Sequence, residues 1–359
     1  MALLVFGASV ALKAVIPPQS APPGVLVQEK SRLVDPATEL LNANAVAVKA
    51  GLFIENLHSL SLRQRIFNAE GLYWLIWPQD IQRVMEAEEI SPLQLVEITN
   101  QVNSSSTLIE PDTAAPVALS DGSFYQLFRF STSLYISKID LCRSPFQRLV
   151  LPVVLEIVPD AFSLSQKKVL LVADTGPGNS TIGADASING FSIESTRYVS
   201  SLHSYGTTWG LNRGSLDYPR LSLEVVMRSD SFSSFVTWIL PLLIVMLIVM
   251  LAPLLDGELG DLRLAIPSTA LLTLIFLQQT YKAELPALNY LTFLDYLYAY
   301  SYIVSLVLFI LFLWGNNVYS NANETSKPAA VLRIAGVDRV FQISSFVGFF
   351  VVGILAWMI

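Results

Sequence analysis

The sequence has few charged residues and a single cysteine. Of its 359 residues, 14% are charged and 53% are hydrophobic, which is too apolar for an ordinary soluble protein. The lone Cys142 excludes a disulfide bond within the chain, so cysteine usage says little about the compartment. The net charge of −7 and the lack of a basic patch interleaved with aromatics argue against nucleic acid as a partner.

The sequence also lacks the motifs of common enzymes. It contains no Gly-Lys phosphate loop, no His-Glu-x-x-His motif and no Gly-x-Ser-x-Gly motif. DTGPGNSTIG resembles the Asp-Thr-Gly triplet of aspartic proteases, but those enzymes need two adjacent carboxylates and no second copy is present. The only histidines, His58 and His203, are isolated and do not suggest a metal site. We therefore expect no enzyme activity, cofactor or metal.

What the sequence does contain is a concentration of apolar residues near its C-terminal end. Four segments each approach the roughly 20 residues that a helix needs to cross a bilayer, and they span residues 232–255, 262–281, 291–314 and 341–359. The sequence therefore predicts a transmembrane domain over residues 230–359, built as an all-α bundle of four helices.

The region before the apolar segments has the pattern of strands. Runs rich in β-branched and aromatic residues cover 46–56, 71–77, 124–140, 148–158 and 218–227. Several alternate with period two, and turn-rich stretches separate them, which is typical of an antiparallel β-sandwich. Only residues 78–97 hint at a helix. We therefore expect an all-β sandwich domain over residues 44–229.

The N-terminal segment and one loop between the apolar segments predict which side of the membrane the sandwich occupies. Residues 1–43 combine an apolar run with a Pro- and Ser-rich stretch, which resembles a secretory signal followed by a linker. No Lys or Arg precedes the run, and a short apolar start to the folded domain or a tethering helix is the alternative. The loop expected at 315–340 carries Lys327, Arg333 and Arg339, which favours the cytoplasmic side. The sandwich would then lie outside the cell membrane.

Polar residues recur along one face of the second apolar segment. At 100° per residue, an arc of about 100° holds Asp261, Ala265, Ser268, Thr269, Leu272, Phe276, Gln279 and Ala283. Polar groups in a bilayer usually face a bundle interior or water. The helix therefore either lies buried, with hydroxyls bonded to neighbouring backbones, or lines water together with other copies.

A sandwich followed by four spans, the second with a polar stripe, resembles the pentameric ligand-gated ion channels of the Cys-loop receptor superfamily. DLCRSPFQ (140–147) is similar to the family's loop signature, without its flanking cysteines, as in prokaryotic members. GFSIEST (190–196) and SLDYPRLSLEV (215–225) are similar to the strands beside the ligand-capping loop. The resemblance covers about residues 44–359. Two departures are Gln147, where an Asp is usual, and Pro267, which should bend or delay the first turns of the pore helix.

The resemblance implies a homopentamer, in which four identical subunits join each chain around a central pore in a bacterial inner membrane. It makes the stripe pore-lining, through Asp261, Ala265, Ser268, Thr269, Leu272, Phe276 and Gln279. Asp261, with Glu258, would select cations by its charge, and Leu272 with Phe276 would form the gate. Asp261 also suits the N-terminus of a helix, and Arg263 is expected to pair with a neighbour. The alternatives are an anion-selective channel and a non-conducting membrane-anchored receptor or scaffold.

An agonist site between subunits is also implied, with Glu97, Tyr73, His203, Tyr205 and Trp209 as its candidate residues. Tyr205 and Trp209 can present ring faces to a cation, with Glu97 as the counter-charge, or they can anchor a Gly-rich loop by packing. The coupling residues implied by the family are Asp140, Pro145, Phe146, Arg228 and Pro286. The expected partners are therefore an unidentified small-molecule or ionic agonist, membrane lipid and permeant ions.

Overall fold

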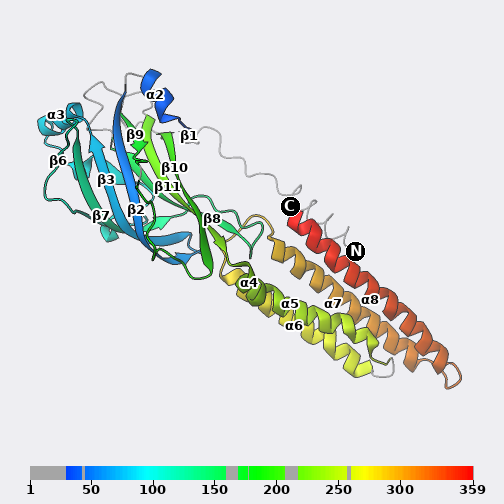
Figure 1. Cartoon of the computed structure of the whole chain (residues 1–359). Coiled ribbons are helices and arrows are strands. Elements are labelled where there is room, and N and C mark those ends of the chain that lie inside the picture. The colour runs from blue at the N-terminus through cyan, green and yellow to red at the C-terminus, as the bar shows by residue number, and fades with distance from the viewer. Residues whose placement is uncertain are drawn as a thin grey trace. The chain divides into compact units, whose positions relative to one another are not determined.

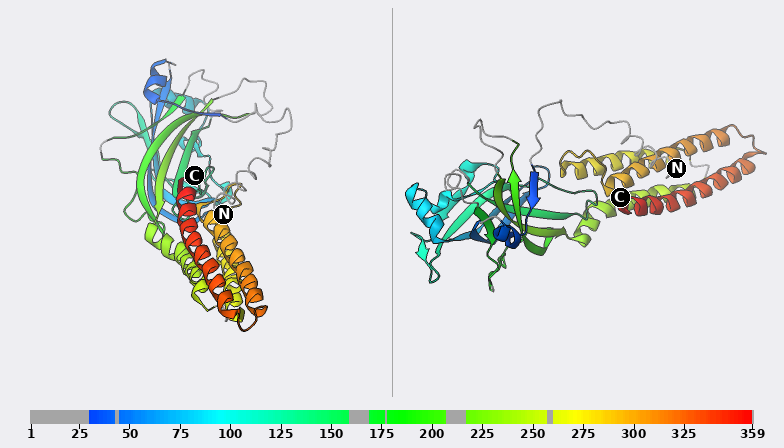
Figure 2. Two further views of the ribbon diagram at one scale, coloured as in Figure 1. Left: turned by 90° about the vertical axis from the view of Figure 1, so that its right-hand side faces the viewer. Right: turned by 90° about the horizontal axis from the view of Figure 1, so that it is seen from above.

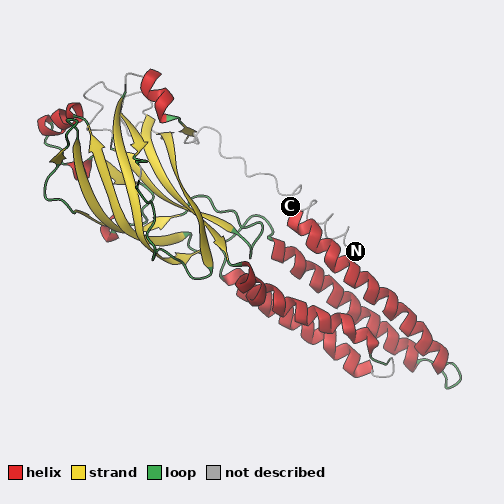
Figure 3. Cartoon of the chain, viewed as in Figure 1, coloured by secondary structure: helices red, strands yellow, loops and turns green. Residues whose placement is uncertain are grey.

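The protein folds into two compact units. The computed structural model describes residues 30–42, 45–158, 169–176, 178–206, 217–256 and 260–358. One unit contains the strands up to Arg228, and the other contains Asp140–Gln147 together with the helices after Ser229. Figure 3 shows that the first unit is mostly strand and the second mostly helix. The predicted order of a β-sheet domain followed by four apolar helices is therefore confirmed.

The first unit is a sandwich of two sheets (Figure 1). The five-stranded sheet has the order β1 (Lys30–Leu33), β10 (Phe191–Ser204), β11 (Asp217–Ser229), β8 (Arg148–Ile157) and β4 (Val96–Ile98). The six-stranded sheet has the order β5 (Leu108–Pro111), β7 (Phe124–Tyr135), β3 (Ile66–Trp77), β2 (Val46–Ser61) and β9 (Val169–Ala173), with β6 (Val117–Ala118) paired to β7. Its described helices are α2 (Pro36–Asn42), α3 (Gln79–Ala87) and the 3-10 turns η1 (Pro92–Gln94) and η2 (Ser104–Ser106).

Alternating burial along the strands builds the sandwich core. In β3 every second side chain is buried, as expected for a strand with one face on a core. Two details differ from the sequence-based expectation. β2 pairs with β9 in parallel, so the sandwich is not purely antiparallel. Strand β1, which pairs with β10, and helix α2 lie where a linker was expected. The helix forms because Pro36 suits the first turn of a helix and Glu39 suits its positive end.

The second unit is a bundle of long helices, which run alongside one another in Figure 2. The first consists of α4 (Ser231–Ser234), the π-helical η5 (Phe235–Ile239), α5 (Leu240–Leu251) and η6 (Ala252–Leu254). The others are α6 (Gly260–Ala283), α7 (Phe293–Ser320) and α8 (Lys327–Met358). Four helices, Ser231–Leu254 and these three, are long and apolar enough to cross a membrane.

The connection between the last two helices is much shorter than predicted. A loop was expected over residues 315–340, but α7 continues to Ser320 and α8 begins at Lys327. The first turns of α8 bury Ala330, Ile334 and Asp338, which recur at the spacing of one helical face. A charged segment can therefore be helical because its few buried residues share one side.

Pro267 does not delay the pore-helix candidate. Helix α6 begins at Gly260 and continues through Pro267, whose side chain is buried. A proline in a helix interior cannot donate to the carbonyl four residues earlier, here that of Arg263. The next residue, Ser268, donates its hydroxyl to the carbonyl of Leu264 at 2.8 Å, a side-chain bond that does not replace the missing bond to Arg263.

Candidate functional site

Helix α6 has one exposed and one buried face. Its buried residues are Arg263, Pro267, Ala270, Leu274 and Tyr281, a spacing that defines a single side. All members of the predicted stripe are exposed: Asp261, Ala265, Ser268, Thr269, Leu272, Phe276, Gln279 and Ala283. Leu272 is 55% exposed and Phe276 is 63% exposed. A single chain therefore leaves the whole stripe uncovered.

Three serine and threonine hydroxyls of α6 bond to their own helix. Ser268, Thr273 and Thr280 each donate to the carbonyl four residues earlier, at 2.8, 2.9 and 3.0 Å. In the described part of the chain none of the three donates to another helix. A hydroxyl that donates in this way keeps lone pairs for further partners. The exposed Ser268 and Thr280 can therefore present oxygen atoms to water or ions.

The N-terminal end of α6 carries two charges of opposite sign on different sides. Asp261 is exposed in the first turn, where the helix dipole favours an acid, while Glu258 lies outside the described residues. Arg263 is buried and pairs with Asp338 of α8, which confirms the expectation that it bonds to a neighbour. A Cβ on Gly260 would lie 2.4 Å from Oδ1 of Asn316, so glycine allows α6 to start close against α7.

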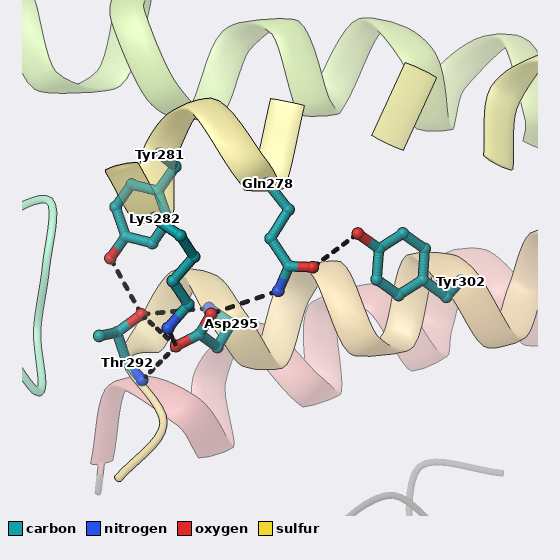
Figure 4. Close-up of polar contacts among 6 residues, drawn as sticks. All are labelled: Gln278, Tyr281, Lys282, Thr292, Asp295 and Tyr302. Carbon is teal, nitrogen blue, oxygen red and sulfur yellow. Dashed lines mark hydrogen bonds and ion pairs between the residues drawn. The ribbon is translucent and has the colours of Figure 1, made fainter. Parts of the chain in front are cut away.

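A polar network joins the other end of α6 to the start of α7 (Figure 4). Asp295 is buried, and its Oδ2 accepts from Lys282 Nζ at 2.6 Å and from Thr292 N at 2.9 Å. Thr292 caps α7 and accepts from the hydroxyl of Tyr281 at 2.9 Å. Gln278 bridges Asp295 Oδ1 and the hydroxyl of Tyr302. These contacts fix the C-terminal turns of α6 to α7.

We expect Asp295→Ala to destabilise the helical unit. The substitution leaves Lys282 and the α7 cap without their carboxylate. Because the Lys282 side chain is 35% exposed, the cost falls below that of a fully buried ion pair, and we expect about 1–3 kcal/mol for the lost cap and charged hydrogen bonds. The check is the melting temperature in detergent, with the exposed carboxylate variant Glu284→Gln as the control. Equal melting temperatures for both variants would show that the network contributes little to stability.

The loop that connects β7 and β8 in the sequence packs on the helical unit. The carbonyl of Cys142 accepts from Phe293 N at 2.7 Å, and the amide of Leu141 donates to the hydroxyl of Tyr290 at 3.1 Å. Pro145 is buried, and its carbonyl accepts from Ser229 Oγ at 3.0 Å. Strands of the sandwich are therefore tied covalently to a loop that belongs to the helices.

Aromatic contacts anchor the same loop. The ring of Phe146 lies 6.5 Å from Phe293 and 5.8 Å from Trp357, near the end of α8. The guanidinium of Arg143 lies 5.6 Å from the Trp357 ring. Three of the predicted coupling residues, Asp140, Pro145 and Phe146, thus belong to the helical unit. Pro286, which follows the buried Leu285, belongs to that unit as well, whereas Arg228, exposed at the end of β11, belongs to the sandwich.

The predicted ligand residues occupy different environments. Tyr73 is 1% exposed and stacks on Phe128 in the sandwich core, where burial raises its pKa. A core position does not allow Tyr73 to contact a ligand, and the accessible aromatic residue of β3 is its neighbour Trp74. Glu97 is exposed on β4 and His203 is buried on β10. Trp209 lies outside the described residues.

Tyr205 belongs to a closed cluster on the five-stranded sheet. Its hydroxyl donates to Glu156 Oε1 at 2.9 Å and accepts from Arg220 Nη2 at 2.8 Å, while Arg220 also pairs with Glu156. Arg220 lies 5.4 Å from the centre of the Tyr205 ring. Burial and, secondarily, the Glu156 carboxylate raise the pKa of Tyr205 to about 12. The Tyr205 ring, which was predicted to contact a cationic agonist, therefore already contacts the guanidinium of Arg220.

An open pocket lies on the outer side of the six-stranded sheet. It has a volume of about 510 Å³ and is lined by Phe53, Leu72, Trp74, Ile76, Tyr125 and Leu127 together with Asp174, Gly178, Asn179 and Ser180. Trp74 Nε1 and Asn179 Nδ2 both donate to Asp174 Oδ2, at 2.8 and 3.1 Å. The pocket therefore combines aromatic rings with a carboxylate, which suits a cationic ligand.

Comparison with known proteins assigns no family. No protein-family model matches the chain, and no curated protein matches its sequence. Among the described residues, no cluster of three or more His, Cys, Asp or Glu side chains can hold a metal ion. The sequence reasoning overlooked Asp295 and Asp338. An acid within or beside an apolar span is a signal of a buried polar group. That signal could have marked both acids as candidates for burial, without showing which residue each one pairs with.

Proposed function

We propose that the chain is a subunit of a homopentameric, ligand-gated, cation-selective channel in a cell membrane, with its sandwich on the extracellular or periplasmic side. The observation that carries this proposal is the uncovered stripe of α6. Copies that converge around an axis would surround water with Ser268, Thr269 and Gln279 and would remove those polar groups from lipid.

The loop Asp140–Gln147 supports the ligand-gated part of the proposal. It joins β7 to β8 in the sequence, yet beyond its own residues it makes hydrogen bonds and ring contacts with Tyr290, α7, α8 and Ser229. A displacement of the strands can therefore reach the helices through the covalent chain. The network around Asp295 would carry it from α7 to the end of α6.

Recording from the purified protein in a planar bilayer with a salt gradient tests the proposal. We expect agonist-dependent steps of current with a reversal potential close to that of the cation. A reversal potential near that of the anion would support the anion-selective alternative. No conductance from an assembled, ligand-binding protein would support the scaffold alternative. Mass measurement in mild detergent should give a pentamer, and a stable monomer or dimer that binds ligand would contradict the pore.

We expect Asp174→Asn and Glu97→Gln to shift the agonist concentration at half-maximal current without lowering the maximal current. Loss of a charge–charge contact with the ligand worth about 0.2–1 kcal/mol corresponds to a shift of roughly 1.4- to 5-fold. Candidate agonists come from a thermal-shift screen of amines, amino acids, protons and divalent ions. Glu88→Gln is the matched control, because this exposed carboxylate neither lines the pocket, as Asp174 does, nor belongs to the predicted agonist site, as Glu97 does. Equal loss of current at every concentration would indicate misfolding instead of weaker binding.

A further inference from the structure

Arg263 occupies an unusual place for a cation near the mouth of the proposed pore. It follows Asp261 by two residues, or about 3 Å along the helix axis. The Asp261 side chain is exposed, whereas the Arg263 side chain is 3% exposed. A cation near the N-terminus of a helix is disfavoured by the helix dipole. Something must therefore hold this cation inside the bundle.

Three helices meet on the Arg263 guanidinium. Its Nη2 pairs with Asp338 Oδ2 of α8, and its Cζ lies 4.1 Å from the ring centre of Phe312 on α7. Asp338 is itself 7% exposed through its side chain. The Nε of Arg263 has no hydrogen-bond partner among the described residues. Within that part of the chain, Asp338 is the carboxylate that compensates the charge of Arg263.

Removing Asp338 would leave a buried cation without a counter-charge, which is strongly unfavourable. An arginine side chain can extend its charged end toward water while its methylene groups stay against apolar surface. The nearest end of α6 is its start, where the Asp261 carboxylate is exposed. Positions i and i+2 do not face each other on a helix, so the released guanidinium would not pair with Asp261 of the same turn. It would instead bring a positive charge to the same mouth and offset the field of the Asp261 carboxylates there.

We propose that Asp338 is a positioning residue for ion selectivity, which holds Arg263 inside the bundle so that Asp261 alone sets the charge at the inner mouth of the pore. This inference rests on the proposed function. It assigns to α8 a part in selectivity, although the residues proposed to line the pore lie on α6.

The test is the permeability ratio of cation to anion, measured from reversal potentials in a potassium chloride gradient. Charged rings raise local counter-ion concentration tenfold or more, so we expect Asp338→Asn to lower the ratio by about tenfold. Asp338→Glu keeps the charge and should retain most of the wild-type ratio. The double variant Arg263→Leu/Asp338→Leu removes both charges and should restore the ratio. A purely structural role for Asp338 would not predict that restoration.

The outcomes separate this inference from the proposed function. A wild-type ratio in Asp338→Asn channels, with Asp261→Asn altered, would overturn the role of Asp338 and leave the channel proposal standing. A low ratio that persists in the double variant would also overturn it. A wild-type protein that does not conduct would refute the proposed function itself. If Asp338→Asn assembles poorly alone, co-expression with wild-type subunits should lower the ratio in steps with the variant's share, and an unchanged ratio would overturn the inference.

Discussion

Replacing Leu272 with serine is expected to give current in the absence of agonist. Leu272 lies at the centre of the exposed stripe, between the hydroxyls of Ser268 and Thr269 on one side and Phe276 on the other. Leucine side chains that converge on an axis make a constriction that water leaves spontaneously, so ions stop there. A hydroxyl in place of the isobutyl group would keep that constriction wet.

The size of the effect follows from the apolar surface involved. Burying one leucine side chain is worth about 1.5–3 kcal/mol, and 1.4 kcal/mol corresponds to about tenfold in an equilibrium constant. We therefore expect the agonist concentration at half-maximal current to fall by at least about tenfold in Leu272→Ser. Phe276→Ala should act in the same direction but more weakly.

The control for the gate is Leu271→Ser, which makes the same chemical change at the next, half-buried position. It should leave the dose response close to that of the wild type, provided that the protein assembles. The contradicting result is that Leu272→Ser channels assemble normally, yet stay closed without agonist and keep the wild-type dose response. That result would contradict the assignment of the gate to Leu272. Reduced assembly with unchanged sensitivity would make Leu272 a packing residue.

Substitution of Asp261 is expected to change ion selectivity more than any other charge reversal on α6. Asp261 is the only acid on the exposed stripe of the helix, and a ring of carboxylates in a narrow entrance concentrates cations and repels anions. Asp261→Asn should lower the cation-to-anion permeability ratio by about tenfold or more. Asp261→Lys should reverse the sign of the reversal potential in a salt gradient.

One further substitution and one control test which carboxylates set the cation-to-anion permeability ratio. Glu258→Gln tests whether the acidic turn before α6 shares the role of Asp261. Glu324→Gln removes an exposed carboxylate in the connection between α7 and α8 and should leave the ratio unchanged. Wild-type reversal potentials in both Asp261 and Glu258 variants would assign selectivity to the outer end of the pore.

The faces of α6 could be predicted from the sequence because its polar and apolar residues segregate at 100° intervals. A helix with such a pattern has one orientation that buries Ala270 and Leu274. The partner of Arg263 could not be predicted, since Asp338 is 75 residues away and was assigned to a loop. Hydropathy alone marks where a span is apolar, and it does not mark where an amphipathic helix begins.

The faces of β3 illustrate a different limit. The strand ends in LYWLIW, in which both alternating sets are apolar: Leu72, Trp74 and Ile76 on one side and Tyr73, Leu75 and Trp77 on the other. Period two fixes the two sets but not which of them faces the core. The structure buries the set with Tyr73. The indole ring of Trp74 lies over Gly51 on β2. A Cβ on Gly51 would lie 2.0 Å from that ring, so the glycine is needed for this packing.

The measurement that tests the exposed stripe of α6 as a pore lining most directly is a cysteine scan of this helix. Replacing Cys142 with serine removes the only native thiol, so each introduced cysteine can be modified alone by a charged thiol reagent during recording. We expect modification to change the current at Ala265, Ser268 and Leu272 and to leave it unchanged at Ala270 and Leu274. Equal modification on both faces, or modification only at Ala270 and Leu274, would contradict a pore lined by the exposed stripe.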